Sequence, residues 1–357
     1  MSAGRKLVCV APSRPPQCQV IDFKVPSPSH GEVLVKVEAT SVNPIDVKRA
    51  SGYGQRLLKL KGAGRFPLTV GNDVAGVVMS TGGGVSGWKA GDRVFGLVPT
   101  GPQGAHASHV LVKARHLRAS PACYSPSELA TLPYTFTTLW LALRGVGLSE
   151  QHARHKQVLV HGASGGLGQL ALQVLTLWGA RVTAVCSTAH VQTCHELGAT
   201  TVLDRTRASL SSLPPVFDAS FNFANWADDS LLISRLKRGA LGHATTVHPL
   251  LGSLDDLGWL GGTWHALQAW RGMRGQLRAQ AGSGARYVWT IFQPDMQALD
   301  ALHGWLHGNV GLHLPLGLQT DLEHAPEAFE HVAQRRAGRA VLIPVNDRRM
   351  DGAEVPR

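Results

Sequence analysis

Hydrophobic and polar residues alternate along much of the first third of the chain. The stretch EVLVKVEATSV (32–42) places apolar side chains at about every second position, as a half-buried β-strand does. DVAGVVMSTG (73–82) and DRVFGLV (92–98) are shorter, rich in valine and bounded by glycine. Turn-forming pieces such as TGGGVSGWKAGD separate these segments. Roughly the first 125 residues are therefore predicted to form a small β-barrel or sandwich.

The pattern changes near Ser125. The stretch SPSELATLPYTFTTLWLALRGVG (125–147) has helical spacing, with Ser127 as a candidate N-cap. Strands and helices then alternate: we expect strands at 157–161, 181–186 and 201–203, helices at 167–178 and 189–197, and later strands within 216–223, 238–248 and 285–292. A helix within 294–309 and a strand–helix–strand tail complete the pattern. This alternation predicts an α/β fold with a parallel sheet covered on both faces.

The segment VLVHGASGGLGQLALQVL (158–175) fits two motifs with different functions. Gly162-Ala163-Ser164-Gly165-Gly166 matches G-x-S-x-G, the turn that presents a nucleophilic serine in many hydrolases. Gly162, Gly165 and Gly168 also match G-x-x-G-x-x-G, a turn that places phosphates against a helix N-terminus. Both motifs require a strand before the turn and a helix after it.

The dinucleotide interpretation explains more of the turn. Gly162 permits the sharp bend, Gly165 lets a pyrophosphate approach the backbone, and Gly168 lets the helix pack closely on the strand. The predicted cofactor site also includes Ser164, Gly166 and Leu167.

The hydrolase interpretation needs an acid and a histidine after Ser164. Candidates exist, namely Asp204 or Asp218 with His243 or His248, but the chain has 17 histidines, so such candidates carry little information. In the hydrolase fold the turn follows several strands of its own sheet, whereas here a separate β domain is predicted before it. We therefore favour nucleotide binding.

The residues after the next strand bear on the choice of nucleotide. That strand ends about 20 residues beyond the glycine turn, where a dinucleotide fold contacts the ribose. An acid there would favour NAD, but this sequence has Ser187, Thr188 and His190. Hydroxyls and an imidazole suit a 2′-phosphate, and Arg205 and Arg339 can add positive charge. NADPH is therefore the predicted cofactor.

Composition narrows the class of protein. The 357 residues are 44% hydrophobic and 17% charged, which fits one large or two medium globular domains. No apolar run reaches the ~18 residues of a membrane span, and we find no signal-peptide pattern. Five cysteines without a C-x-x-C pair argue against a disulfide framework or a cysteine zinc cluster, so we expect a cytoplasmic location. The net charge of +11 is spread along the chain, which favours a basic enzyme over a nucleic-acid-binding protein.

Several motifs together resemble one family. They are SVNPIDVKRASGYG (41–54), FPLTVGNDVAGVV (66–78), GWKAGDRVFG (87–96), ATLPYTFTTLW (130–140), GASGGLG (162–168) and LGATTVLD (197–204). In this order they resemble the medium-chain dehydrogenase/reductases of the zinc-independent quinone oxidoreductase type, closest to the reticulon-interacting protein branch. The resemblance implies a GroES-like catalytic β domain (1–126 and 309–357) and a Rossmann NADPH-binding domain with a doubly wound parallel sheet (127–308). The active site would then lie in the cleft between these domains.

The resemblance also implies roles for single residues. Asn43 would orient the nicotinamide or the substrate carbonyl, and Tyr53 would hydrogen-bond or protonate a developing oxyanion. Asp46 and Tyr134 would belong to the substrate site. Further cofactor contacts are expected from three residues: Thr138, Asn222 and Val247.

Zinc-dependent members of the family carry ligands that this chain lacks. They have Cys at the position of Asn43 and Gly-His-Glu at the position of Gly71-Asn72-Asp73. A catalytic zinc needs three good ligands around one open position. The remaining histidine pairs, His106 with His109 and His303 with His307, have no evident third ligand. We therefore expect no metal.

These features predict an NADPH-dependent, zinc-independent reductase of quinones or α,β-unsaturated carbonyls. Two alternatives stay open: an enoyl-thioester reductase, and a catalytically weak NADPH-binding regulatory or scaffold protein. The Trp- and Arg-rich segment 259–286 is either a helical cover or a surface for a membrane or partner, with Arg271, Arg274 and Arg278 on one helix face. A homodimer is compatible with the family.

Overall fold

The computed structural model describes residues 3–308 and 310–344, which form two compact units. Of the described residues, the first unit contains 3–134, 299–308 and 315–344, and the second contains 135–298 and 310–314. The assignment of 1–126 with 309–357 to catalysis and of 127–308 to the cofactor stays a prediction. Within it, residues 1, 2, 309 and 345–357 lie outside the described part of the chain.

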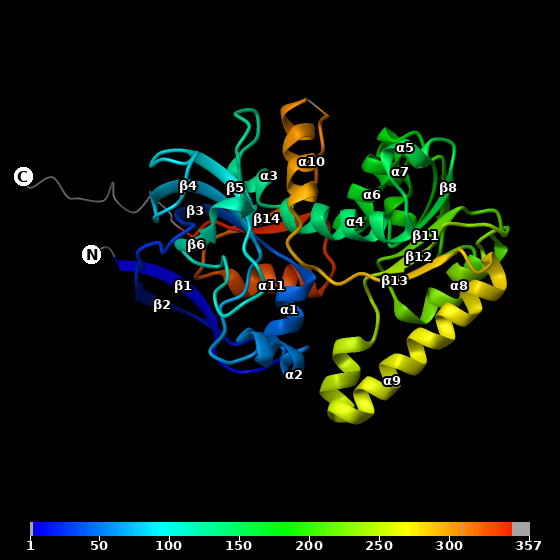
Figure 1. Ribbon diagram of the computed structural model, residues 1–357, viewed down its shortest axis with the longest axis horizontal. Coiled ribbons are helices and arrows are strands. Elements are labelled where there is room, and N and C mark those ends of the chain that lie inside the picture. Colours follow the sequence, from blue (N-terminus) through cyan, green and yellow to red (C-terminus); the bar gives the residue numbers. More distant parts are fainter. Residues whose placement is uncertain (1–2, 309, 345–357) are drawn as a thin grey trace, which may run out of the picture. The chain divides into compact units, whose positions relative to one another are not determined.

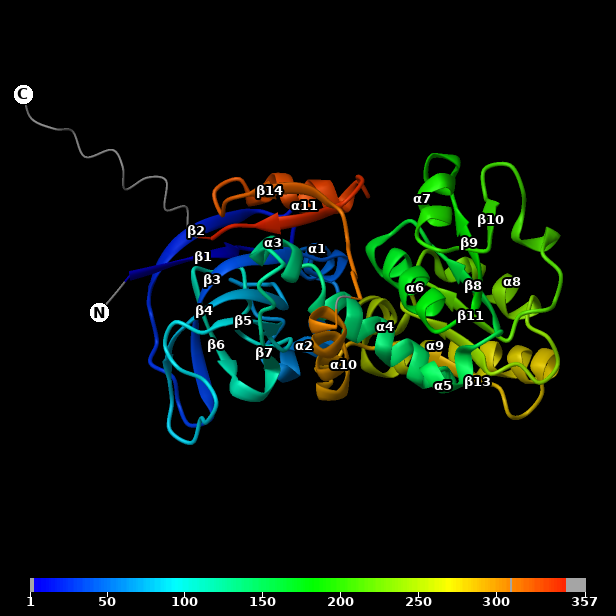
Figure 2. The same cartoon turned by 90° about the horizontal axis from the view of Figure 1, so that it is seen from above.

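The first unit is built mainly from β-strands (Figure 1). Its strands are β1 (Ala3–Cys9), β2 (Cys18–Lys24), β3 (Glu32–Val42), β4 (Asp73–Thr81), β5 (Arg93–Leu97), β6 (His109–Lys113), β7 (Leu117–Ala119), β14 (Leu316–Thr320) and β15 (Arg339–Leu342). β1 and β2 form an antiparallel hairpin; the others form a seven-stranded sheet in the order β14-β15-β3-β4-β5-β7, with β6 paired to β3. Figure 2 shows the red C-terminal strand beside the blue N-terminal strands. The C-terminal strand β15 thus pairs with β3, from the N-terminal part of the chain, in one sheet.

The predicted alternating strand at 32–42 is confirmed as β3, the centre of this sheet. Val33, Val35 and Val37 are completely buried in one apolar cluster with valines of β4, β5 and β6. The short helices of this unit are α1 (Pro44–Ala50), α2 (Gln55–Leu58), α3 (Pro126–Leu129) and α11 (Ala325–Ala333). α1 begins directly after β3, so the central strand delivers the predicted site residues that follow it.

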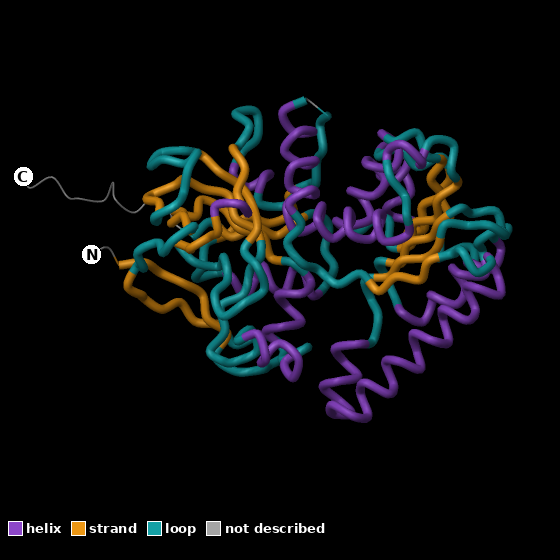
Figure 3. The backbone as a smooth tube through the Cα atoms, in the orientation of Figure 1, coloured by secondary structure: helices purple, strands orange, loops and turns teal. Residues whose placement is uncertain are grey.

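The second unit contains a six-stranded parallel sheet, which Figure 3 shows as an orange layer between purple helices. Its strands are β8 (Gln157–His161), β9 (Arg181–Cys186), β10 (Thr201–Asp204), β11 (Ala219–Asn222), β12 (Gly242–Thr245) and β13 (Arg286–Trp289), in the order β10-β9-β8-β11-β12-β13. Its main helices are α5 (Glu150–Ala153), α6 (Gly166–Leu177), α7 (Val191–Glu196), α8 (Asp229–Ser234) and α9 (Leu250–Ala281). α6 packs on β8 and β9, whereas α8 and α9 pack on the opposite face (Figure 1). The predicted α/β class with a doubly wound parallel sheet is confirmed.

The predicted helix at 125–147 is divided into α3 and α4 (Pro133–Val146). Pro133 explains the division, because proline lacks an N–H and fits only at the start of a helix. The N-cap is Ser125, whose hydroxyl accepts from the backbone N–H of Glu128, rather than Ser127 as predicted. Ser127 is buried and donates its hydroxyl to Gln319.

The Trp- and Arg-rich segment belongs to α9, which bends at Gly258. The φ of Gly258 is 75°, a left-handed value that favours glycine. Gly262 lies so close to the carbonyl oxygen of Ser253 that an added Cβ would be 2.4 Å from it. The two parts of α9 therefore fold against each other as a helical hairpin with Gly258 at its tip. A separate helix, α10 (Met296–His307), follows β13. Within 3–308 and 310–344, no helix is long and apolar enough to cross a bilayer.

Candidate active site

A buried polar cluster in the first unit surrounds Asp73, the first residue of β4. The hydroxyl of Ser41 donates to the Asp73 carboxylate over 2.6 Å and the side-chain amide of Asn43 donates over 2.8 Å. The backbone N–H of Tyr134 donates to the second carboxylate oxygen over 2.6 Å. Burial raises the pKa of Asp73 to about 6, although these hydrogen bonds and the charge of Arg339 act against that rise. In the sequence, Asp73 was noted only within Gly71-Asn72-Asp73, where zinc-dependent members have Gly-His-Glu, and it was not predicted as a site residue.

Asn43 links this carboxylate to a cation. Arg339 donates from Nη2 to the side-chain oxygen of Asn43 over 2.6 Å. The amide of Asn43 is thus bound at both ends, with Asp73 on one side and Arg339 on the other. The Nε of Arg339 is buried and has no hydrogen-bond partner among the described residues. Arg339 was predicted only as a source of charge for the cofactor, and the structure brings it to the predicted catalytic amide.

Asp46 holds the loop that presents Asn43. One carboxylate oxygen accepts from the backbone N–H of Asn43 over 2.8 Å, which forms a capping box at the start of α1. The other oxygen accepts from the backbone N–H of Gly71 over 3.0 Å. Both oxygens therefore fix the backbone beside the cluster. The predicted place of Asp46 in the substrate site stays a prediction.

The two predicted tyrosines belong to the same unit. Tyr53 lies in the turn between α1 and α2, and the ammonium of Lys48 is 5.2 Å from the centre of its ring. Tyr134 is half-buried at the start of α4, where its phenol interacts electrostatically with Arg49 and Arg339. Each tyrosine therefore has at least one cationic side chain near it.

The histidines considered as metal ligands have other surroundings. His106 is completely buried, and its Nε2 lies 3.1 Å from the carbonyl oxygen of Ser41. Burial lowers its pKa, which keeps the ring neutral. The rings of His303 and His307 are 4.1 Å apart on α10. Over the described ranges, no three histidine, cysteine, aspartate or glutamate side chains gather closely enough to hold a metal ion.

The glycine turn of the second unit lies between β8 and α6, as both motifs required. Gly162 has a φ of 81°, and an added Cβ would come within 3.1 Å of Ala224. At Gly168 an added Cβ would be 2.2 Å from the carbonyl oxygen of Gly162, so only glycine fits there. Gly165 is exposed at the N-cap of α6 and has only an ordinary contact, at 3.6 Å, in the place of a side chain. Two glycines thus serve packing, and the third leaves the turn open to solvent.

The other predicted cofactor residues of this unit lie mostly at the carboxyl ends of neighbouring strands. Ser187, Thr188 and His190 follow β9, Arg205 follows β10, Asn222 ends β11, and Val247 comes after β12; Gly166 and Leu167 begin α6, and Thr138 is buried in α4. In open α/β sheets, ligands bind at the carboxyl ends of the strands, where the strand order reverses. In this sheet the order reverses between β8 and β11. The structure thus brings the strand-end residues to one edge of one sheet.

Asp204 changes the expected surroundings of the ribose site. The register of β10 with β9 pairs Asp204 with Cys186, immediately before Ser187. The hydroxyl of Thr188 donates to the Asp204 carboxylate over 2.6 Å, and this bond lowers the pKa of Asp204. The inference that no acid lies beside these hydroxyls was therefore wrong. The acid was missed because it comes from the next strand.

The residues considered for a serine hydrolase are not assembled around Ser164. His243 is buried, with its Nδ1 2.7 Å from the hydroxyl of Ser220 and its Nε2 3.2 Å from Asp229. Asp218 pairs with Lys156 and Lys237, and the ring of His248 stacks on Trp289. Within the described part of the chain, no histidine hydrogen-bonds the Ser164 hydroxyl. The arrangement gives that serine no general base.

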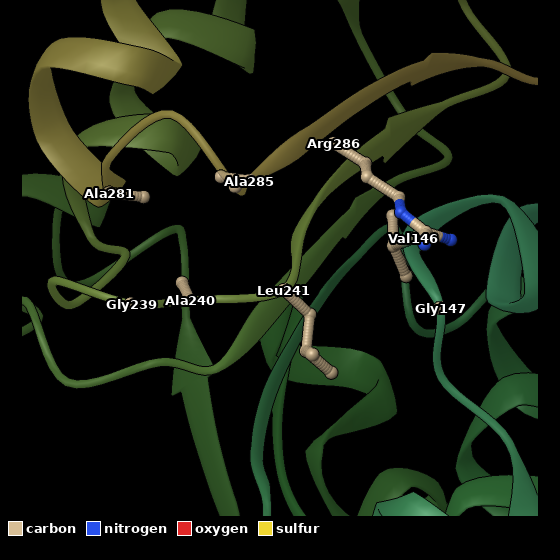
Figure 4. Close-up of a pocket in the computed structure, with 9 residues that line it drawn as sticks. Val146, Gly147, Gly239, Ala240, Leu241, Ala281, Ala285 and Arg286 are labelled. Atoms are coloured by element: carbon tan, nitrogen blue, oxygen red, sulfur yellow. The ribbon is translucent and has the colours of Figure 1, made fainter.

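The second unit has a pocket of about 280 Å³, and Figure 4 shows the residues that line it. Its lining comes from the end of α4 and from the segments that precede β12 and β13, with Leu241 and Arg286 as the large side chains. These segments are at the amino ends of the strands, opposite to the predicted cofactor edge. Glycine and alanine supply much of the remaining lining, so the pocket offers little chemistry.

The tip of the α9 hairpin exposes large apolar side chains. Leu260 is 90% exposed and Trp264 is 62% exposed, and Leu257 and Trp259 are also exposed. Trp270 and Met273, further along α9, instead pack against the core of the unit, and Arg274 lies over the ring of Trp270 at 4.9 Å. One part of this segment is therefore the helical cover that we considered, and the tip is not covered by any described residue.

Comparison with known proteins adds a family to this geometry. Residues 29–122 match the alcohol dehydrogenase GroES-like domain. The chain is 36% identical over 334 residues to the mitochondrial NAD(P)H oxidoreductase RTN4IP1 of Homo sapiens, a match that covers 88% of this chain and 82% of that protein. It is 34% identical over 186 residues to the chloroplastic quinone-oxidoreductase QR1 of Triphysaria versicolor, covering 52% and 55% of the two chains. The quinone oxidoreductase of Coxiella burnetii has the same fold, with a TM-score of 0.78 at 19% identity over 96% of this chain and all of that one.

The comparisons contradict one expectation. The human relative is named as a mitochondrial protein, whereas the cysteine content was taken to indicate the cytoplasm. Free thiols indicate a reducing environment, which is not restricted to the cytoplasm, so the inference of a cytoplasmic location was wrong.

The similarity to the human oxidoreductase extends over most of both chains, and the GroES-like match lies within the predicted β domain. The predicted family is thereby confirmed, and so is a general oxidoreductase role with a nicotinamide cofactor. The chain belongs to the medium-chain dehydrogenase/reductase superfamily, in the branch that contains the NAD(P)H oxidoreductase RTN4IP1.

Proposed function

We propose that this protein is a zinc-independent, NADPH-dependent reductase of quinones or α,β-unsaturated carbonyls. The observation that carries the proposal is the open turn between β8 and α6. Gly165 leaves that turn accessible, and the N-terminus of a 12-residue helix follows it. Backbone N–H groups at such a terminus favour an anion such as a pyrophosphate.

The residues around the turn fit a dinucleotide. Ser164 through Leu167 would hold the pyrophosphate with their backbone N–H groups, and the strand-end residues Ser187, Thr188 and His190 would face the adenosine ribose. Asn222 is buried and holds the loop at residues 223–225 through its side-chain oxygen, which accepts from the backbone N–H groups of Ala224 and Asn225. When bound, the nicotinamide of NADPH supplies a hydride to the substrate.

The choice of NADPH over NADH rests on a balance of charge. The hydroxyls of Ser187 and Thr188, with Arg205 and Arg207 nearby in the sequence, suit a 2′-phosphate. Asp204 opposes this choice, but Thr188, Thr206 and Arg207 all bind its carboxylate. We infer that the site can still accept the 2′-phosphate, because these partners bind the carboxylate of Asp204.

Zinc independence is supported by the donor set around Asn43. An amide replaces the cysteine of zinc-dependent members, and the carboxylate of Asp73 is engaged by Ser41, Asn43 and Tyr134. A catalytic zinc site requires three ligand atoms that converge on one open position. Here the side chains bind one another instead.

The protein's own groups would act on charge and protons. Reduction of a quinone or an enone places negative charge on an oxygen, which hydrogen-bond donors stabilise. Tyr53 offers a phenolic O–H that can donate to this oxygen or deliver a proton. Asn43 orients the guanidinium of Arg339, a cation that an anionic ligand or an oxyanion would meet. Asp46 keeps Asn43 in place through the capping box.

Stopped-flow oxidation of bound NADPH against a panel of quinones and enones tests the proposal. We expect oxidation by at least one class of acceptor, without added metal and unchanged by a chelator. Tyr53→Phe should slow hydride transfer or the proton step while NADPH binding stays intact. Oxidation by long-chain enoyl thioesters alone would favour the enoyl-thioester reductase. Tight NADPH binding without oxidation by any acceptor would favour the regulatory or scaffold role.

We also propose that the exposed tip of α9 contacts a membrane surface that carries anionic lipids. Leu260 and Trp264 are apolar and exposed, and Arg271 and Arg278 are exposed further along the same helix face. Apolar side chains combined with basic ones on one helix face suit the lipid–water interface. A homodimer stays a prediction from the family.

A further inference from the structure

Two thiols face each other at the end of the β1–β2 hairpin. Cys9 and Cys18 are directly paired in the register of the two strands, and their sulfur atoms are 3.5 Å apart. Cys9 is 1% exposed, whereas Cys18 is half-buried. Nothing in the proposed reductase chemistry uses either residue.

The backbone around Cys9 places the two side chains on the closer type of cross-strand pair. The N–H of Cys9 donates to the carbonyl oxygen of Leu68 over 2.8 Å, and the N–H of Leu68 donates to the carbonyl oxygen of Cys9 over 2.9 Å. Cys9 therefore does not exchange backbone hydrogen bonds with Cys18. In such a non-hydrogen-bonded antiparallel pair the Cα atoms are about 4.5 Å apart. That spacing lies within the range that a disulfide bridges.

The two sulfurs have different chemical characters. The sulfur atoms of Cys9 and Cys18 form a hydrogen bond in which either can be the donor, and this bond lowers the pKa of Cys18. The same hydrogen bond and burial raise the pKa of Cys9. Cys18 is thus the more nucleophilic and the more accessible sulfur, and Cys9 is a protonated partner behind it.

The remaining cysteines provide a contrast within the same chain. Cys186 and Cys194 also lie close enough to influence each other's pKa, but both are buried. Cys123 is exposed. Among the described residues, the pair in the hairpin is the only pair of facing cysteines in which one thiol is accessible to solvent.

We propose that Cys9 and Cys18 form a reversible dithiol–disulfide site that hydrogen peroxide oxidises. The Cys18 thiolate attacks one peroxide oxygen, the O–O bond breaks, and the leaving hydroxide takes up a proton to become water. The sulfur of Cys9 then attacks the Cys18 sulfenic acid, forming the S–S bond as the Cys9 proton leaves with the hydroxyl as a second water. Two thiols are oxidised and one peroxide is reduced. A small-molecule dithiol reverses the reaction by thiol–disulfide exchange.

The site has a direct structural link to the turn that carries Tyr53. The loop between the two cysteines contacts the end of α1, where the N–H of Ser13 donates to the carbonyl oxygen of Ala50 over 3.4 Å. An added Cβ on Gly52 would lie 3.1 Å from Pro12 of this loop. A disulfide closes the loop at residues 10–17 into a ring and restricts it. Oxidation therefore stabilises the segment that packs against the Tyr53 turn.

Peptide mapping of the full-length protein tests the site. The reduced protein is treated with hydrogen peroxide, alkylated with iodoacetamide after denaturation, and digested with trypsin without reduction. One tryptic peptide, residues 7–24, holds both cysteines, because trypsin does not cut the Arg14–Pro15 bond. We expect this peptide unalkylated and about 2 Da lighter than the dithiol form, for the loss of two hydrogens, and restored by dithiothreitol. Hydrogen exchange at 10–17 and 50–54 should slow in the oxidised protein.

Control variants keep the test decisive. Cys18→Ser alters a half-buried position and should leave Cys9 alkylatable after peroxide. Cys9→Ala removes the resolving thiol, so Cys18 should proceed to sulfinic acid. The proposal is overturned if peptide 7–24 remains doubly alkylated, if wild-type Cys18 becomes sulfinic acid beside a reduced Cys9, or if the buried pair Cys186 and Cys194 oxidises as readily.

Discussion

The side-chain amide of Asn43 donates to the carboxylate of Asp73 over 2.8 Å, in a part of the structure where both residues are buried. Arg339 donates to the opposite end of the same amide. A neutral side chain thus separates a buried carboxylate from a cation. Asp73, Asn43 and Arg339 thus form one hydrogen-bonded chain.

Replacing the carboxylate should change how stability depends on pH. Burial raises the pKa of Asp73 from 3.8 to about 6 in the folded protein, so the folded state favours the protonated form. The stabilisation that the protonated Asp73 gives the folded protein is complete below pH 3.8 and is lost as the pH rises through about 6. Relative to Asp73→Asn, the wild-type free energy of unfolding should fall by up to about 3 kcal/mol between pH 4 and pH 7. Denaturant unfolding of both proteins across this range measures it, and a constant difference would contradict the shifted pKa.

Truncating Asn43 should affect both stability and activity. Asn43→Ala leaves Arg339 and Asp73 each without one partner, which should cost about 1–3 kcal/mol of unfolding free energy. Because Arg339 also loses its orientation, NADPH oxidation should slow.

Asn72→Ala is the matched control for Asn43→Ala. Asn72 is equally buried and donates to the carbonyl oxygen of Val98, outside the chain from Asp73 to Arg339. It should lose stability but retain the kcat of the wild type. Equal loss of kcat in the two variants would show that Asn43 is only a structural residue.

Removing the charge of Asp204 should improve NADPH binding relative to NADH. Its carboxylate lies against Thr188, and its lowered pKa keeps it ionised at neutral pH. A like charge beside the 2′-phosphate weakens NADPH binding, so Asp204→Asn should raise the NADPH preference about fivefold. Dissociation constants for both nucleotides measure the ratio, with the exposed Asp256→Asn as control. An unchanged ratio would place the 2′-phosphate elsewhere.

The tip of α9 should bind anionic lipid. Co-sedimentation with phosphatidylcholine vesicles that contain phosphatidylglycerol should exceed that with phosphatidylcholine alone. Leu260→Ser and Trp264→Ser should abolish the difference, whereas Leu177→Ser, at another exposed leucine, should not. No binding to either vesicle would contradict membrane contact.

The sequence predicted what depends on local pattern. Alternation defined β3 at both ends, and the glycine spacing located the turn between β8 and α6. The sequence pattern did not predict the break before α4, and it placed the N-cap two residues after Ser125. These details depend on single residues, namely Pro133 and those of the capping box, and not on a repeating pattern.

Contacts between strands that are distant in the sequence could not be predicted from local patterns. Ala340 pairs with Val42 in the β15–β3 ladder, and this register carries the neighbouring Arg339 to Asn43. Asp204 reaches Thr188 in the same way, through the pairing of β10 with β9. In both cases the partner is chosen by sheet order, which no local pattern contains.

The central claim is that a nucleotide lies on the open turn between β8 and α6, and NADPH binding to Gly165→Val tests it most directly. A Cβ added at Gly165 meets only an ordinary contact, at 3.6 Å, and the position is exposed, so the variant should fold and unfold like the wild type. If the pyrophosphate occupies that space, calorimetric titration should show a loss of NADPH affinity of at least about a hundredfold. Unchanged affinity in a folded Gly165→Val protein would show that the cofactor does not bind at this turn.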